Sequence, residues 1–272
     1  MKHIEYSEID STNNEAKRRL AAAANPAALS ALYGTVLTAR RQTAGRGRLG
    51  KDFLSPGGDS IYISFILAPP DEAAHLQMIT VAAAVAVCRA IEKTLGLRPG
   101  IKWVNDVFID GKKICGILAE AVSDPRPGAV KAVILGIGIN INIPENDFPE
   151  TLRASAGSLA LPPDGRPRLL DALEKEVFAC VRALKNPAAL LGEYRARSFV
   201  VGKQIFVLKQ TPGRPDSSDI PNSPNDPNKT DDPNKKTTPA AAIRITDDGG
   251  LEVKYEDGAR EVLRSGEVSI RY

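Results

Sequence analysis

The chain has 272 residues, of which 43% are hydrophobic and 25% charged, and its formal net charge is +3 at pH 7. This composition is that of a soluble globular protein, with room for one large domain and a smaller one. The net charge is too small to predict nucleic-acid binding by itself, and an aromatic content of 5% leaves few stacking platforms for single strands. The three cysteines are far apart, which argues against a disulfide framework and fits a reducing cytoplasm.

Membrane and metal classes are also disfavoured. Residues 1–6 contain no apolar signal region, and the longest apolar run, Met78 to Cys88, is too short to span a bilayer. We therefore expect a cytoplasmic protein without membrane contact. The sequence has only two histidines, His3 and His75, which are too few to favour a histidine metal site or a catalytic triad. We therefore predict no metal site built by the protein. Chemistry based on Lys, Arg, Asp and Asn suits phosphoryl or adenylyl transfer.

The first elements in chain order are a helix and two strands. Ser11 or Thr12 is the expected N-cap, and Thr12 followed by Glu15 is a capping-box pattern. Apolar residues at helical spacing continue until Asn25-Pro26 ends the predicted helix. A strand is predicted over residues 35–41 and another over residues 60–67.

A loop rich in glycine and arginine joins these strands: Gly45-Arg46-Gly47-Arg48-Leu49-Gly50-Lys51-Asp52. It contains both G-x-G-x-x-G and G-x-x-x-x-G-K. However, Asp52 replaces the Ser or Thr of a P-loop, and a turn and a strand follow instead of a helix. Glycines let backbone N–H groups approach an anion, and three cations lie within six residues. The loop is predicted to wrap around an anionic ligand, with a solvated basic hairpin as the alternative.

The middle of the chain alternates helices and strands. An alanine-rich helix over residues 75–95 is apolar almost all round, which predicts burial against a sheet. Asp110-Gly111 between two apolar runs indicates a hairpin. Further strands are predicted at residues 101–103, 107–109, 113–122 and 130–141. Two amphipathic helices are predicted at residues 168–184 and 187–197.

From about Val200 the pattern becomes all-β. Five short strands predict a small barrel, at residues 204–209, 241–246, 251–255, 260–263 and 268–272. Residues 211–239 interrupt it with seven prolines, four asparagines and a single large aliphatic residue, Ile220. Such a segment cannot bury enough apolar surface to offset its ordering, so a disordered insertion is predicted. The expected domains are residues 1–199 and 200–272.

Five motifs, in this order and spacing, resemble the catalytic half of biotin protein ligases, which biotinylate a lysine of acyl-CoA carboxylases. They cover roughly residues 5–145 and are Asp10-Ser11-Thr12-Asn13, Gln42 to Lys51, Lys102-Trp103-Val104-Asn105-Asp106, Lys113 to Glu120 and Gly136 to Asn140. The resemblance implies an α+β fold: a mixed β-sheet with packed helices, as in class II synthetases, and a small SH3-like β-barrel. Two features depart from the pattern, Val104 in place of the usual proline and the insertion at 211–239.

The resemblance also implies a set of site residues. Those implied for biotin are Ser11, Thr12, Asn13, Gln42, Gly45, Arg46, Gly47, Arg48, Lys102 and Gly116. Those implied for ATP are Arg48, Phe53, Asn105, Asp106, Lys113 and Asn140. The catalytic charges would be Arg46, Arg48 and Lys102. Lys102 follows an apolar residue on a short strand and could neutralise a carboxylate and a phosphate together; the alternative is a solvent-facing charge. Trp103 is predicted to lie in the core.

The implied reaction has two steps, with biotin and ATP as substrates and Mg²⁺ accompanying ATP. Biotin first becomes biotinyl-5′-adenylate, and the biotinyl group then passes to a lysine of the biotin carboxyl carrier protein or domain of an acyl-CoA carboxylase. Only ten residues precede Ser11, so we expect no N-terminal DNA-binding domain and no nucleic-acid partner. A homodimer is a possible form of self-association.

Two alternatives stay open. A lipoate or octanoate ligase or transferase could share the fold, although the Arg-Arg-x-Ser-Gly-Gly-Gly segment usual there is missing. A nucleic-acid-binding module, using the basic loop and the barrel, would show a steep salt dependence of its affinity.

Overall fold

A computed structural model describes residues 2–48, 53, 60–69, 75–124, 129–208 and 237–270. The chain divides into two compact units, Met1–Ser198 and Phe199–Tyr272, each of which is described by itself. Residues 49–52 of the basic loop and residues 211–236 of the predicted insertion lie outside the described part. No helix in the described part is long and apolar enough to cross a membrane.

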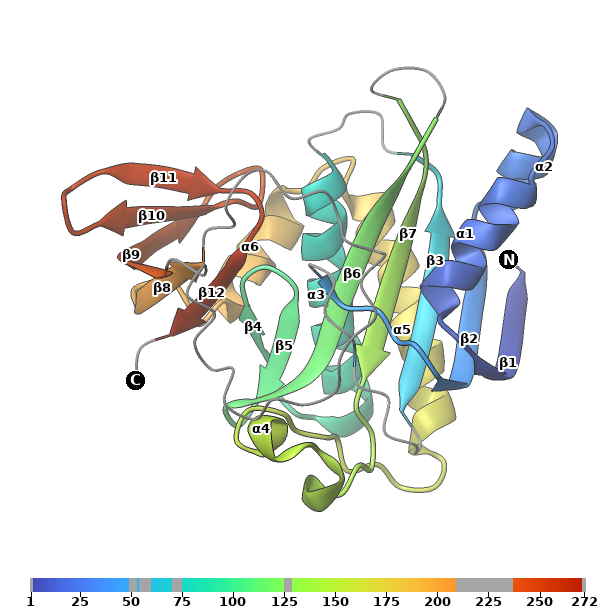
Figure 1. Cartoon of the computed structure of the whole chain (residues 1–272), viewed down its shortest axis with the longest axis horizontal. Coiled ribbons are helices and arrows are strands. Elements are labelled where there is room, and N and C mark those ends of the chain that lie inside the picture. The colour runs from blue at the N-terminus through green and yellow to red at the C-terminus, as the bar shows by residue number, and fades with distance from the viewer. Residues whose placement is uncertain are drawn as a thin grey trace, which may run out of the picture. The chain divides into compact units, whose positions relative to one another are not determined.

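The first unit is built on a seven-stranded sheet with the strand order β1-β2-β3-β7-β6-β5-β4 (Figure 1). Its strands are β1 (His3–Ile9), β2 (Thr35–Gln42), β3 (Ile61–Leu67), β4 (Gly100–Lys102), β5 (Asp106–Ile109), β6 (Lys112–Ser123) and β7 (Val130–Ile139). The strands β1 and β2 pair in parallel, and the other neighbouring pairs are antiparallel. The predicted mixed sheet is confirmed.

Helices cover both faces of this sheet (Figure 1). The helices described in the first unit are α1 (Thr12–Ala22), α2 (Pro26–Ser30), α3 (His75–Leu95), α4 (Glu150–Arg153), α5 (Gly165–Ala183), α6 (Ala188–Arg197) and the 3₁₀ turn η2 (Glu145–Asp147). Ile66 of β3 clusters with Ala16 and Leu20 of α1. The preceding residue, Phe65, packs edge-to-face on Phe178 of α5, with 5.5 Å between ring centroids. Because adjacent strand residues point to opposite faces, α1 and α5 lie on opposite sides of the sheet.

Local signals positioned two elements accurately. The apolar helix α3 has the predicted bounds and is fully buried from Val81 to Cys88. The hairpin between β5 and β6 turns at Asp110 and Gly111, whose φ angles of 50° and 76° are both left-handed. That geometry is the one that a two-residue Asp-Gly turn favours.

The start of the chain differs from the prediction. The strand β1 was not expected, although its exposed and half-buried residues alternate as in an edge strand. The predicted capping box is wrong, because Ser11 is the N-cap of α1 and forms no side-chain cap hydrogen bond. Glu15 instead accepts hydrogen bonds from Arg18, Arg19 and Tyr6. Asn25 does not only end a helix; its side chain accepts from the N–H of Ala28 at 2.8 Å and caps α2.

The second unit is a five-stranded antiparallel sheet with the order β11-β10-β9-β8-β12. Its strands are β8 (Gln204–Leu208), β9 (Thr237–Ile245), β10 (Leu251–Tyr255), β11 (Arg260–Leu263) and β12 (Glu267–Ile270). In the described residues β11 and β12 stand at opposite ends of the order, so the sheet is open and the predicted closed barrel is wrong. It is still consistent with an SH3-like unit. Residues 237–239 of the predicted insertion belong to β9, because they pair with β8 from Leu208 to Phe206.

Candidate active site

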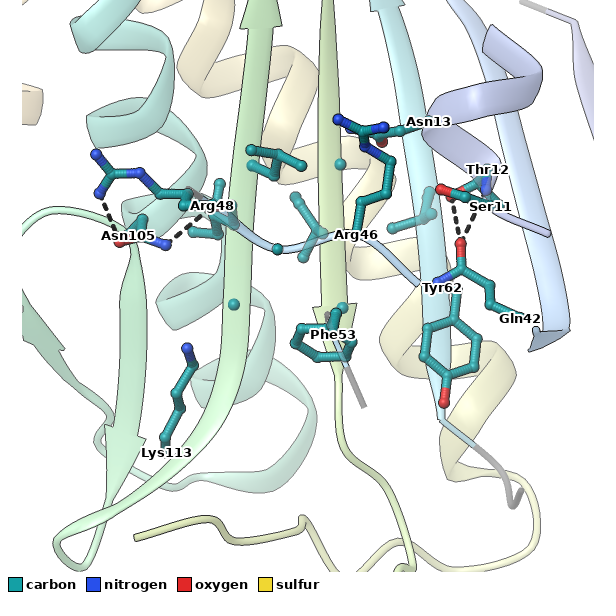
Figure 2. Close-up of a pocket in the computed structure, with 18 residues that line it drawn as sticks. Ser11, Thr12, Asn13, Gln42, Arg46, Arg48, Phe53, Tyr62, Asn105 and Lys113 are labelled. Carbon is teal, nitrogen blue, oxygen red and sulfur yellow. Dashed lines mark hydrogen bonds between the residues drawn. The ribbon is translucent and has the colours of Figure 1, made fainter. Parts of the chain in front are cut away.

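A cavity of about 60 Å³, open to solvent on one side, lies on the face of the first sheet that α1 covers (Figure 2). Its walls bring together residues that are distant in sequence, including most of those expected at the site. The expected residues that line it are Ser11, Thr12, Asn13, Gln42, Arg46, Gly47, Arg48, Phe53, Asn105, Lys113 and Gly116. The expected residues Gly45, Lys102, Asp106 and Asn140 are not among its lining.

The floor of the cavity depends on the register of three strands. Tyr62 of β3 pairs with Gly138 of β7, which pairs with Gly116 of β6. The Phe53 ring lies over the two glycines, so a Cβ atom would come within 2.6 Å of it at Gly138 and 3.0 Å at Gly116. Phe53 also packs edge-to-face against Tyr62, with 6.4 Å between ring centroids. Both glycines are therefore required for a flat group to lie on the sheet. Sequence reasoning did not single out Tyr62.

One wall is a buried hydrogen-bond network that links α1 to two strands. The Gln42 side-chain oxygen accepts from the N–H of Thr12 at 2.8 Å and from its hydroxyl at 3.2 Å (Figure 2). The Ser64 hydroxyl lies 2.7 Å from the Thr12 hydroxyl oxygen and 2.6 Å from the Asn13 side-chain oxygen. Gln42 is buried. Ser64 was missed, although a serine in an otherwise apolar strand was the available signal.

The basic loop supplies the cover. Figure 2 shows the segment that carries Arg46 and Arg48 crossing in front of β7 and β6. Arg46 pairs with Glu120 of β6 at 3.3 Å, and Arg48 donates to the side-chain oxygen of Asn105 at 3.0 Å. The Gly45 carbonyl accepts from the N–H of Phe53 at 2.9 Å. Two cations are thus held over the sheet, at separate points of the cavity.

Comparison with known proteins identifies the family. Residues 12–140 match the model of the biotin/lipoate A/B protein ligase family. Over 217 residues the chain is 33% identical to the biotin--[acetyl-CoA-carboxylase] ligase of Mycobacterium tuberculosis, which covers 77% of this chain and 75% of that protein. The chain belongs to the biotin/lipoate A/B protein ligase family.

Other relatives agree with this assignment. The chain is 39% identical over 158 residues to the bifunctional ligase/repressor BirA of Bacillus subtilis, an alignment covering 58% of this chain and 46% of that protein. It therefore spans about half the length of that relative. The biotin protein ligase of Aquifex aeolicus in complex with biotin and ATP superposes with a TM-score of 0.71 at 26% identity, over 99% of this chain and 98% of that one. The resemblance read from the motifs is confirmed.

The family motif with the substituted proline forms a tight turn between β4 and β5. The peptide bond between Trp103 and Val104 is cis. Trp103 is 3% exposed, which confirms its predicted core position. The buried Tyr194 hydroxyl of α6 donates to the Val104 carbonyl at 3.0 Å. Asn105 donates its side-chain amide to the Ile117 carbonyl at 3.0 Å, so the motif is fixed from both sides.

The expected site residues outside the cavity lining have other contacts. The Lys102 ammonium lies 5.9 Å from the centroid of the Phe108 ring. Asp106 pairs with Lys113, which does line the cavity, at 2.7 Å. The Asn140 side chain donates to the Gly157 carbonyl at 2.9 Å, just beyond the end of β7. That hydrogen bond anchors the loop that contains Gly157 to the end of β7.

A buried thiol lies next to the site. Cys115 precedes Gly116 and is 1% exposed. Burial raises the pKa of the Cys115 thiol well above its usual value, and nearby Lys113 only partly offsets this. The thiolate, which is the reactive form, is therefore strongly disfavoured. Oxygen and nitrogen groups remain to carry the chemistry.

Proposed function

We propose that the protein attaches biotin to a lysine of a carrier protein in two ATP-dependent steps. The observation that carries this is the convergence of Arg46, Arg48 and Lys113 on a cavity whose polar wall includes Gln42 and Thr12. Biotin combines an anionic carboxylate with a polar ureido ring, and this cavity offers both cations and buried hydrogen-bonding groups. The names of the relatives above, and a related structure with biotin and ATP, support the same choice of substrates.

The polar wall suits the ureido ring. Because the Gln42 oxygen accepts from Thr12, the amide presents its NH₂ group as a donor. A ureido carbonyl accepts such a hydrogen bond, and the ring N–H groups need acceptors such as the hydroxyl oxygens of Ser11 and Thr12. A buried urea without these partners would lose binding energy. We assign Ser11, Thr12, Asn13, Gln42, Gly45, Arg46, Gly47, Arg48, Lys102 and Gly116 to biotin and its adenylate.

In the first step the biotin carboxylate oxygen attacks the α-phosphorus of ATP. An acyl–phosphate bond forms, the bond to the bridging oxygen breaks, and pyrophosphate leaves. Negative charge builds on the α-phosphate, where the positive charges of Arg46, Arg48, Lys102 and Lys113 would stabilise it. We assign Phe53, Asn105, Asp106, Lys113 and Asn140, with Arg48, to the nucleotide.

In the second step the ε-amine of a carrier lysine attacks the acyl carbon. An amide bond forms, AMP leaves with the electron pair of the anhydride bond, and the amine loses a proton. The loop that carries Arg46 and Arg48 would shield the anhydride from water until the carrier arrives. The carrier that we propose is the biotin carboxyl carrier domain of acetyl-CoA carboxylase, as the name of the Mycobacterium tuberculosis relative suggests. The reaction would take place in the cytoplasm.

Mg²⁺ would enter with ATP as part of the substrate. Within the residues that the structure describes, no group of three or more His, Cys, Asp or Glu side chains could hold a metal ion. Phosphate oxygens and water are the usual ligands of Mg²⁺ at nucleotide sites. Asp106, beside Lys113, is the carboxylate that we propose to face the ion.

The test is pyrophosphate exchange with biotin, lipoate and octanoate in parallel. Biotin should support exchange at least a hundredfold better than the other two acids, because neither the alkyl chain of octanoate nor the dithiolane ring of lipoate can form the hydrogen bonds that the polar wall offers to a urea. Equal or better exchange with lipoate or octanoate would transfer the protein to the other branch of the family. A nucleic-acid module fits less well, since Arg46 and Arg48 line a cavity instead of an open basic face.

A further inference from the structure

Glu120 of β6 ends the hydrogen-bond network along the cavity wall, although it does not line the cavity. One carboxylate oxygen accepts from the Asn13 side-chain amide at 2.8 Å. The other accepts from the Lys17 ammonium at 2.8 Å and from Arg46 at 3.3 Å. The network then continues from Asn13 through Ser64 to the residues that we assign to biotin. Among the residues that the structure describes, Glu120 is the single charged acceptor of this network.

The charge of Glu120 determines which way the Asn13 amide points. A carboxylate only accepts hydrogen bonds, so the Asn13 NH₂ group must face it and the Asn13 oxygen must face Ser64. A neutral amide at position 120 could accept or donate equally well. Asn13 could then turn over, and the donor and acceptor pattern of the wall would no longer be unique.

Glu120 also holds Arg46, one of the two loop cations in the described part of the chain. Its side chain is 17% exposed and that of Arg46 is 45% exposed, so the carboxylate is the fixed partner. Burial raises the pKa of Glu120, but hydrogen bonds from Lys17 and Asn13, with the charge of Arg46, lower it overall. The group is therefore ionised at neutral pH. Because Lys17 and Arg46 share this one negative charge, a net positive charge remains there for an anionic ligand.

We propose that Glu120 is a positioning residue for the biotin half of the site. It orients the Asn13 amide and keeps Arg46 at the same end of the cavity, without touching the ligand itself. This inference rests on the proposed biotin ligase function. It extends that function to a residue whose contacts with α1 lie more than a hundred positions away in sequence.

The test is Glu120→Gln, which keeps the shape of the side chain and removes its charge. KM for biotin in the exchange reaction should rise about tenfold, the change expected for one lost hydrogen bond to a charged group. KM for ATP should change less than twofold. The matched control is Glu252→Gln in the second unit, where a glutamate likewise pairs with two arginines, Arg244 and Arg260. The control should leave both KM values unchanged.

Two more variants separate positioning from simple docking of α1. Lys17→Met removes the ion pair between α1 and β6 but leaves Asn13 and Arg46 on Glu120, so KM for biotin should change less than threefold. In an Asn13→Ala background, Glu120→Gln should have a clearly smaller effect, because its main target is gone. If Lys17→Met matches Glu120→Gln, or if the double variant is additive, the positioning role is wrong.

The outcomes for the two proposals differ. A wild-type chain that supports no exchange with biotin overturns the proposed function. An active wild type with an unaltered KM for biotin in Glu120→Gln overturns only the role of Glu120. Should Glu120→Gln fail to fold, Glu120→Asp keeps the charge but shortens the reach, and it must give the same selective rise; an unchanged KM there also overturns the inference.

Discussion

The hydroxyl of Tyr194 donates a hydrogen bond of 3.0 Å to the carbonyl oxygen of Val104, which immediately precedes Asn105. Both groups are buried, and Tyr194 belongs to α6, outside the strands that form the cavity. A helix thus supports the turn whose next residue contacts Arg48. Tyr194 does not line the cavity, but because it supports the turn before Asn105, we predict that its replacement affects nucleotide binding.

Tyr194→Phe should destabilise the fold by about 1–3 kcal/mol, because it leaves a buried carbonyl without its donor. KM for ATP should rise several-fold as Asn105 loses its fixed position. The matched control is Tyr33→Phe, since the Tyr33 hydroxyl also donates to a backbone carbonyl, that of Lys131, at 2.7 Å. Urea denaturation should show a loss of stability in both variants. In pyrophosphate exchange, KM for ATP should change only in Tyr194→Phe. Equal KM values for the two variants would refute a role of Tyr194 in the site.

Lys102→Ala should fold normally and lose adenylate formation by about 10²–10³-fold, which is typical for removal of one charge-stabilising group. Lys102→Arg should recover only part of the rate, because a guanidinium is larger and planar. Lys113→Ala is the comparison, since Lys113 lines the cavity and should lose at least as much. If Lys102→Ala keeps exchange within threefold of wild type while Lys113→Ala does not, Lys102 is only a surface charge.

Local patterns predicted those parts of the molecule whose causes are local. The helix α3 follows from a continuous apolar run, and the turn at Asp110-Gly111 follows from the backbone freedom of these two residues. The edge strand β1 was missed because its alternation is short and its residues are mostly exposed or half-buried. The predicted barrel failed because a sequence shows strands but not whether the last one closes on its sheet.

The site divides in the same way. The basic loop is contiguous, so its residues could be recognised together. The floor of the cavity requires the β6–β7 register that places Gly116 opposite Gly138. Neither segment by itself indicates which strands pair or in which register. Glu120 appeared in a motif, but its role depends on contacts with α1 across more than a hundred residues. Asn140 was expected at the nucleotide, and no local signal indicates that its side chain also donates to the Gly157 carbonyl of a later loop.

Gly136→Ala should weaken biotin binding by displacing Asn13. A Cβ atom at Gly136 would lie 2.3 Å from the Asn13 side-chain oxygen, so the amide has to move. We expect overpacking to cost about 1–3 kcal/mol of stability and KM for biotin to rise at least tenfold. Gly192→Ala is the control, because a Cβ there meets nothing within 4 Å and alanine favours the helix α6. An unchanged KM in Gly136→Ala would mean that Asn13 is not a ligand-binding residue.

Replacement of residues 209–236 by a short Asn-Gly loop should leave biotinylation nearly unchanged. Leu208 pairs with Thr237, so the two ends of the removed segment are already neighbours. The sequence of the segment offers almost no apolar anchor, and shortening the loop lowers the entropic cost of closing it by only about 2 kcal/mol. Carrier biotinylation and thermal unfolding should both stay close to wild type.

A longer deletion provides the contrast. Removing residues 209–239 also takes away the three residues of β9 that pair with Leu208, Val207 and Phe206, and this variant should unfold the second unit. Far-UV circular dichroism and a thermal melt distinguish the two deletions. If the shorter deletion folds like wild type but loses tenfold in carrier biotinylation while pyrophosphate exchange is intact, the removed segment contacts the carrier. A loss in both reactions would instead connect the segment to the adenylation site, and either result would refute the expectation of a neutral insertion.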